Sequence, residues 1–168
     1  VGSDSIPLGP GYGKGDMIAG IHYASEDLIW SIDKHEIDST FGWFHGPWSS
    51  DVKKVSTTVE VPNAVTRVNI RLRYWSFDSW DYEVGRVKVN KVEKSSFSRF
   101  WNNCGNFQTY SGRPGKNHHP NPHYNRTCYI DVDVSSQPIP CQSDTAKMCI
   151  TLTVEGDLSG EHGLYKDE

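Results

Sequence analysis

The sequence has no apolar run close to the ~18 residues that a membrane-spanning helix needs, so we expect no membrane insertion. Basic residues are also few, because 17 Lys and Arg stand against 21 Asp and Glu and leave a formal charge of −4. Nucleic acids and anionic membranes attract strongly basic surfaces. The charge balance therefore gives no reason to expect either of them as a partner.

Familiar catalytic motifs are missing as well. Neither GxSxG nor HExxH occurs, and no Ser or Cys lies in a known nucleophile context. Pairs of Asp and Glu that could hydrolyse glycosides exist, but any acidic chain has them, and only their separation in space would be informative. We therefore expect a non-catalytic protein, with a glycan-processing enzyme as an alternative.

The four cysteines all lie in the second half of the chain, and none forms a CxxC pair. Zinc knuckles need closely paired ligands, so two disulfides are the better interpretation. Three connectivities are open. We favour Cys104–Cys128 with Cys141–Cys149, because the second pair would clip a short loop onto the strand that follows it.

One glycosylation sequon begins at Asn125 and stands close to these cysteines. Disulfides persist in oxidising compartments outside the cytosol. The two features together predict a secreted or cell-surface glycoprotein.

Helical periodicity is absent beyond a turn or two, whereas alternation of apolar and polar residues is strong. Short alternating stretches separated by turns predict one all-β domain over residues 1–168, an antiparallel, jelly-roll-like β-sandwich, with a partly closed barrel as the alternative. We expect an irregular Gly- and Pro-rich arm at 1–20 and a long, polar, disulfide-braced loop at 94–127. The alternating stretches are VSTTVEV (55–61), RVNIRLRYW (67–75), GRVKVNKVE (85–93), CYIDVDVSS (128–136) and KMCITLTVEG (147–156).

The stretch YWSFDSWDYE (74–83) places three carboxylates, Asp78, Asp81 and Glu83, directly after a predicted strand. Their charges repel unless a cation lies between them or they point into water. Ca²⁺ takes six to eight oxygen ligands, which carboxylates, backbone carbonyls and water supply. The alternatives are catalytic carboxylates and a solvated acidic turn paired with Arg71, Arg73 or Arg86.

The run VEVPNAVTRVNIRLRYWSFDSWDYEVGRVKVN (59–90) resembles a module of secreted and ciliary surface proteins of protists and some invertebrates. In that module two strands run into a D-S-W-D-x-E box, which a V-x-V-x strand follows. The resemblance implies an extracellular β-sandwich used in adhesion or matrix contact, with Asp78, Asp81 and Glu83 at a calcium site. The terminal GEHGLYKDE (160–168) is loosely similar to the acidic turn of the family and adds Glu161 and Asp167.

Aromatic side chains make up 12% of the chain, and six of them are Trp. Exposed rings flanked by amides suit sugar binding, although most of these rings could instead fill the ends of a sandwich. We assign Trp75 and Trp80 to packing around the acidic box. The candidate ligand-binding residues are Trp43, Trp48, Trp101, Asn102, Asn103 and Tyr110.

Three imidazoles, those of His118, His119 and His123, lie in the Pro-rich segment GKNHHPNPHYN. They could bind Zn²⁺ or Cu²⁺, but no Cys or carboxylate in the same turn completes a site, and the prolines hold the segment extended. We favour a solvated loop.

Together these features predict a non-catalytic, extracellular, calcium-binding β-sandwich that binds glycans or cell-surface proteins in a lectin-like manner. A structural subunit of an extracellular filament or matrix, which would self-associate, is the second hypothesis. A glycan-processing enzyme is the third.

Overall fold

The computed structural model describes residues 28–38, 42–46, 52–76, 80–101, 103–106, 108–110 and 127–157; within them, the side chains of 35–38, 42–44, 81, 101 and 108–110 are not described. This part of the chain contains strands and no helix, and hence no helix that could cross a membrane. The strands are β1 (His35–Asp38), β2 (Gly42–His45), β3 (Lys54–Val61), β4 (Val68–Ser76), β5 (Trp80–Val89), β6 (Val92–Trp101), β7 (Gln108–Tyr110), β8 (Thr127–Ser136), β9 (Ile139–Pro140) and β10 (Met148–Gly156).

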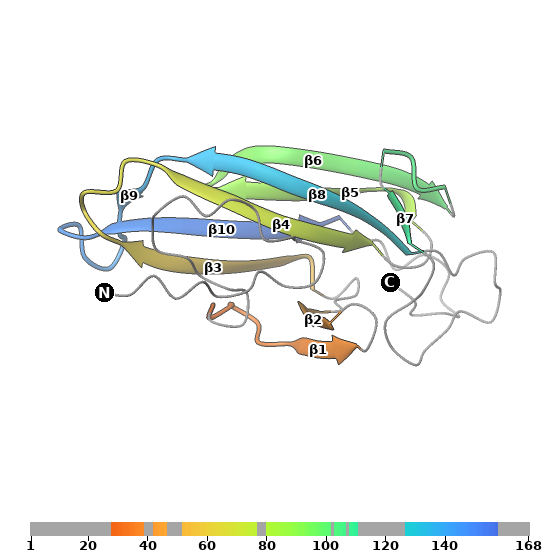
Figure 1. Ribbon diagram of the computed structural model, residues 1–168, viewed down its shortest axis with the longest axis horizontal. Coiled ribbons are helices and arrows are strands. Elements are labelled where there is room, and N and C mark those ends of the chain that lie inside the picture. The colour runs from red at the N-terminus through yellow and green to blue at the C-terminus, as the bar shows by residue number, and fades with distance from the viewer. Residues whose placement is uncertain are drawn as a thin grey trace.

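Two antiparallel sheets face each other across one core. The first has the order β3-β10-β5-β6, with β9 paired to β10, and the second has the order β4-β8-β7. Figure 1 shows β4 and β8 crossing in front of β10 and β5, while β1 and β2 pair separately. The all-β, antiparallel class is therefore confirmed, and the β-sandwich and jelly-roll detail stays a prediction.

The alternation in the sequence fixes which side of each strand enters the core. On β4 the apolar residues at even positions pack against the core, while the outward Arg71 and Arg73 pair with Asp133 and Asp131 of β8. On β5, Val87 and Val89 are completely buried, and each contributes roughly 1.5–3 kcal/mol through burial. The buried cluster comprises Val87, Val89, Phe97, Cys104, Cys128, Val132, Ile150 and Leu152.

The expected long loop at 94–127 is wrong over its first part, because β6 continues to Trp101 and β7 occupies Gln108–Tyr110. The inward positions of β6 carry Phe97 and Arg99, which are both buried, and the outward positions beside them carry Ser96, Ser98 and Phe100. A strand with a charged residue among its inward positions does not show apolar alternation. Residues 111–126, with the three histidines and Asn125, lie outside the described residues.

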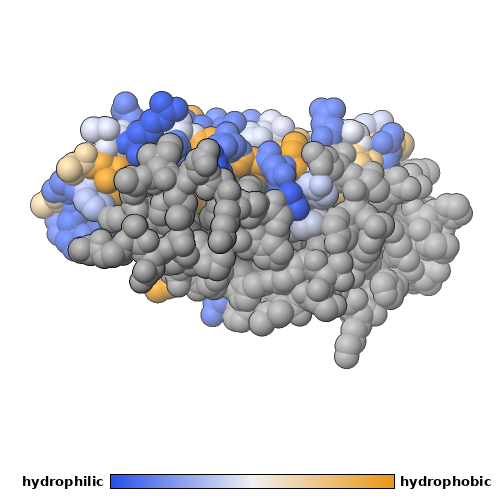
Figure 2. Space-filling model, in the orientation of Figure 1, coloured by the Kyte–Doolittle hydropathy of each residue, from blue (hydrophilic) through white to orange (hydrophobic). Residues whose placement is uncertain are grey.

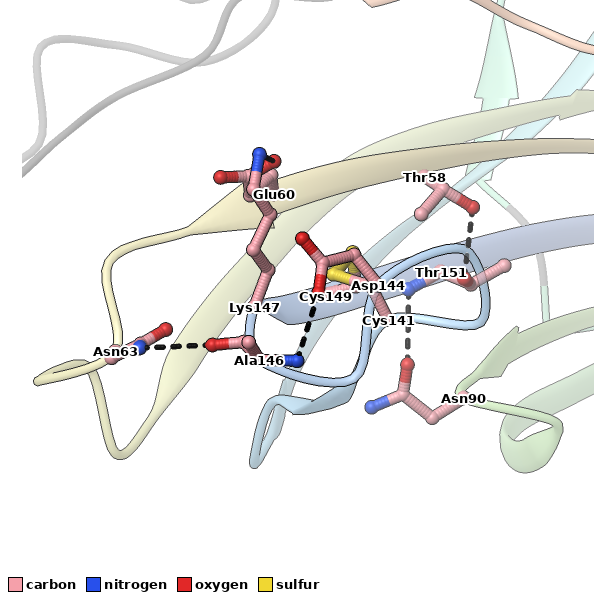
Figure 3. Close-up of a disulfide and its surroundings, with 10 residues drawn as sticks. All are labelled: Thr58, Glu60, Asn63, Asn90, Cys141, Asp144, Ala146, Lys147, Cys149 and Thr151. Carbon is pink, nitrogen blue, oxygen red and sulfur yellow. Dashed lines mark hydrogen bonds and ion pairs between the residues drawn. A yellow bond between two sulfur atoms is a disulfide. The ribbon is translucent and has the colours of Figure 1, made fainter.

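Both disulfides form as favoured. Cys104–Cys128 joins the segment after β6 to the start of β8, and Cys104 and Cys128 belong to the core cluster. Cys141 and Cys149 are eight positions apart in the sequence, and their disulfide ties the β9–β10 connection to β10 (Figure 3).

Short side-chain links hold the turns around Cys141–Cys149 together (Figure 3). Asn90, in a left-handed conformation with φ 51°, accepts a hydrogen bond from the Thr151 amide at 2.9 Å and donates one to the Gln137 carbonyl at 2.9 Å. Lys147 forms a 2.9 Å ion pair with Glu60, and this hydrogen-bonded contact raises the pKa of Lys147. In Figure 1 these turns lie at one end of the molecule, and the starts of β5 and β8 lie at the other.

Candidate functional site

A β-bulge near the start of β5 determines which side chains of the acidic stretch face the core. The register pairs Asp81 with Phe100 and Val84 with Ser98, so Tyr82 and Glu83 together lie opposite Arg99. Tyr82 has φ 68°, a left-handed conformation that is rare for a bulky residue. As a result Glu83 is only 5% exposed, whereas Tyr82 is 67% exposed.

Glu83 and Arg99 are therefore two opposite charges buried at one level of the β5–β6 ladder. The Arg99 guanidinium carbon also lies 5.8 Å from the ring centroid of buried Trp80. Burying either charge without an opposite charge nearby would cost several kcal/mol. Arg99 thus places a positive charge opposite Glu83 in the β5–β6 ladder.

Aromatic rings pack beneath the bulge. The rings of Tyr74 and Phe97 are 4.5 Å apart between centroids, and Trp80 meets Tyr74 edge to face at 6.1 Å. A side chain at Gly85 would have its Cβ 2.8 Å from Phe97 Cδ2 and 3.0 Å from Tyr74 Cζ, so only glycine fits there. Burial raises the pKa of the Tyr74 hydroxyl, which donates a 3.3 Å hydrogen bond to the Glu155 carbonyl. The bulge therefore rests on a closely packed base.

Two aromatic rings stack on the outer side of the same bulge. Tyr82 and Phe100 are 4.4 Å apart between centroids with an interplanar angle of 22°, and Phe100 is 38% exposed. Asn103, also exposed, donates its backbone N–H to the Phe100 carbonyl at 2.9 Å, and its side-chain Oδ1 accepts a hydrogen bond from the Gly105 backbone N–H at 3.0 Å. We call Tyr82, Phe100 and Asn103 the aromatic platform.

The face of the molecule in Figure 2 shows, in its described part, hydrophilic residues with small hydrophobic patches between them. Large exposed apolar side chains in the described residues are correspondingly few and scattered. They are Ile29, Ile32, Tyr82, Val92, Phe100 and Ile139. Among these six, Tyr82 and Phe100 form a stacked aromatic pair.

The predicted calcium ligands are only partly visible. Asp78, Glu161 and Asp167 lie outside the described residues, the side chain of Asp81 is not described, and Glu83 faces the interior. The described residues contain no group of three or more His, Cys, Asp or Glu that could hold a metal ion. The calcium site therefore stays a prediction, and the burial of Glu83 makes it a poorly accessible ligand.

The arginines suggested as partners of the acidic stretch pair with carboxylates elsewhere. Arg71 meets Asp133 at 3.0 Å, and Arg73 meets Asp131 at 2.7 Å in a contact with two hydrogen bonds. Arg86 lies 3.6 Å from Glu93. None of these three ion pairs involves the acidic stretch.

The predicted sugar-binding residues have different outcomes. Trp48 and Asn102 lie outside the described residues, and Trp43, Trp101 and Tyr110 lie on strands without described side chains. Asn103 is exposed and belongs to the aromatic platform. The packing role of Trp80 is confirmed, and Trp75 packs against Tyr129 at 5.1 Å.

Sequence reasoning missed Tyr82 and Phe100. One signal was present: Val87 lies seven positions after Trp80, an odd offset, so both can face the core only if a bulge intervenes. That bulge is what turns Tyr82 outward.

No family model matches the chain, and no curated protein or solved structure is significantly similar to it.

Proposed function

We propose that the protein is a non-catalytic, extracellular recognition module that binds glycans through the aromatic platform. One observation carries the proposal: the backbone at Tyr82 adopts a left-handed conformation, with φ 68°, while its ring stays 67% exposed. The left-handed conformation costs roughly 1–2 kcal/mol for an ordinary residue. Burial of the ring does not offset this cost, and such local strain is typical of functional sites.

The chemistry of the platform suits a sugar. An aromatic face carries partial negative charge, and the C–H bonds on the apolar face of a pyranose carry partial positive charge, so the two attract when they stack. Asn103 is exposed and bonded to Phe100 through the backbone; its Oδ1 accepts from Gly105, and its side-chain N–H groups can donate to a sugar hydroxyl. The packed base of Tyr74, Trp80 and Phe97 supports this surface, which lowers the entropy cost of binding.

The two disulfides are compatible with an extracellular protein, and they support placing this recognition function outside the cell. Cys104–Cys128 adjoins the platform, because Cys104 follows Asn103 directly. The covalent link thereby restrains the segment that carries the amide.

The test is affinity electrophoresis in gels that contain neutral polysaccharides, with Tyr82→Gly as the key variant. Glycine accepts the left-handed conformation at no steric cost, so this variant removes the ring and leaves the bulge intact. We expect the wild type to be retarded and Tyr82→Gly to bind about tenfold more weakly, equivalent to ~1.4 kcal/mol.

Ile139→Ala is the matched control, because Ile139 is a 43% exposed apolar residue on β9, at the opposite end from the start of β5 (Figure 1). It should bind as the wild type does. Equal retardation of wild type and Tyr82→Gly in every polysaccharide would refute the proposal. Sedimentation as a sugar-independent polymer would favour the matrix-subunit hypothesis.

A further inference from the structure

We infer that the binding surface extends from the aromatic platform along the outer side of β6, so that it takes an internal run of a linear, neutral polysaccharide. This inference rests on the proposed function and specifies its ligand class. The added residues are Ser98 and Ser96, which with Phe100 form what we call the β6 strip.

The strip follows from the alternation of β6. Phe97 and Arg99 face the interior and are buried, so Phe100, Ser98 and Ser96 face outward, and all three are exposed. Alternate residues of a strand are about 7 Å apart, so the strip spans roughly 13 Å. That length accommodates several consecutive sugar rings and exceeds what one terminal sugar would cover.

The shape of the surface favours an internal segment of the glycan. Ser96, Ser98 and Phe100 are exposed, and among the described strands β6 pairs only with β5, so the described elements place no further strand along the other edge of β6. A site for a terminal sugar would need groups that enclose the ring. An open strip instead lets a chain continue past both ends.

The described charges beside the two serines of the strip favour a neutral ligand. Ser96 lies opposite Arg86 in the register, and the Arg86 guanidinium lies 3.6 Å from the Glu93 carboxylate, so these opposite charges offset each other. Ser98 lies opposite Val84, which carries no charge. The two serine hydroxyls can each donate and accept hydrogen bonds, as the hydroxyls of a neutral sugar do.

Binding to oligosaccharides of increasing length tests the inference. Titration calorimetry would use cello-oligosaccharides and chito-oligosaccharides as neutral probes, with heparin as the charged comparison. We expect affinity for one neutral series to rise with each added unit until the strip is filled and then to level off, and we expect weaker binding of heparin.

The double variant Ser96→Val/Ser98→Val removes both hydroxyls with side chains that favour strands. It should bind long oligosaccharides about tenfold more weakly, which corresponds to the loss of two ordinary hydrogen bonds. Its affinity for the disaccharide should not change. Thr153→Val, on β10 of the same sheet and two strands away from β6, is the control and should match the wild type.

The outcomes separate the two proposals. Length-independent binding that still requires Tyr82, or preferred binding of heparin, overturns the β6 strip and leaves the aromatic platform in place. Binding that does not depend on Tyr82 refutes the proposed function itself. Unchanged affinity of the double serine variant for long oligosaccharides also overturns the strip.

Discussion

Glu83 and Arg99 lie opposite each other across the β5–β6 bulge, and both side chains are buried. We predict that Glu83→Gln lowers the free energy of unfolding by about 3 kcal/mol, because it removes a buried carboxylate that lies opposite the buried Arg99 charge. Urea denaturation followed by tryptophan fluorescence measures this loss.

Two further variants show whether the loss reflects charge compensation. Glu93→Gln removes a carboxylate from the half-exposed pair with Arg86 and should cost less than about 1 kcal/mol. The double variant Glu83→Gln/Arg99→Met should lose less stability than the sum of its single variants. Strict additivity would mean that the two charges do not interact.

A second prediction separates a calcium site from this buried charge pair. If Asp78 and Asp81 hold Ca²⁺, millimolar calcium raises the melting temperature relative to EDTA, because only the folded state binds the ion. We expect Asp78→Asn and Asp81→Asn to abolish that rise. Glu83→Gln should lower the melting temperature in both buffers, since its carboxylate faces the interior. Identical wild-type melting curves in calcium and in EDTA would contradict the predicted calcium site.

Gly85 carries the third prediction. Gly85→Ala would place a Cβ against Phe97 and Tyr74, so that one or both of these closely packed rings would have to shift. Overpacking of this kind costs typically 1–3 kcal/mol, so we expect a loss of about 2 kcal/mol in chemical denaturation.

The comparison variant is Gly105→Asn, at a position with φ 55° where a Cβ would meet nothing closer than 3.5 Å. Asparagine tolerates left-handed backbone better than other side chains, so we expect a smaller loss. A loss equal to that of Gly85→Ala would argue against overpacking as the cause.

The sequence predicted those strands in which the alternation of apolar and polar residues matches the alternation of buried and exposed positions. Inward residues of β4, β8 and β10 are mostly apolar at every second position, so water exclusion alone specifies their faces. The favoured Cys141–Cys149 disulfide agrees with this pattern, because the loop that it closes leads directly into a strand.

The aromatic platform could not be predicted in this way, because it depends on how β5 and β6 pair with each other. The alternation within either strand does not specify that pairing. Arg99 is buried opposite Glu83, yet in the sequence an isolated arginine within SSFSRF indicates an exposed loop. The outward orientation of Tyr82 depends on a bulge, and a bulge is defined by the pairing of two strands and not by either strand alone.

The last prediction concerns alkaline pH and the Tyr74 hydroxyl. An unperturbed tyrosine has a pKa near 10, and burial raises the pKa of Tyr74 above that value in the folded state. The folded protein therefore keeps this proton at a pH where the unfolded chain has released it. Stability is unaffected by this group below about pH 10, and it falls as the pH rises further, by up to about 1.4 kcal/mol per pH unit.

Tyr74→Phe removes the titrating group and keeps the ring that packs against Phe97 and Trp80. Near neutral pH it should cost no more than about 1 kcal/mol, because the hydrogen bond to the Glu155 carbonyl is long, at 3.3 Å. Above about pH 10 the variant should lose stability less steeply than the wild type in denaturant titrations, so that the two curves converge or cross. Parallel stability curves over this range would mean that the Tyr74 hydroxyl ionises as readily in the folded protein as in the unfolded chain, and the packed base under the bulge would then be open to water.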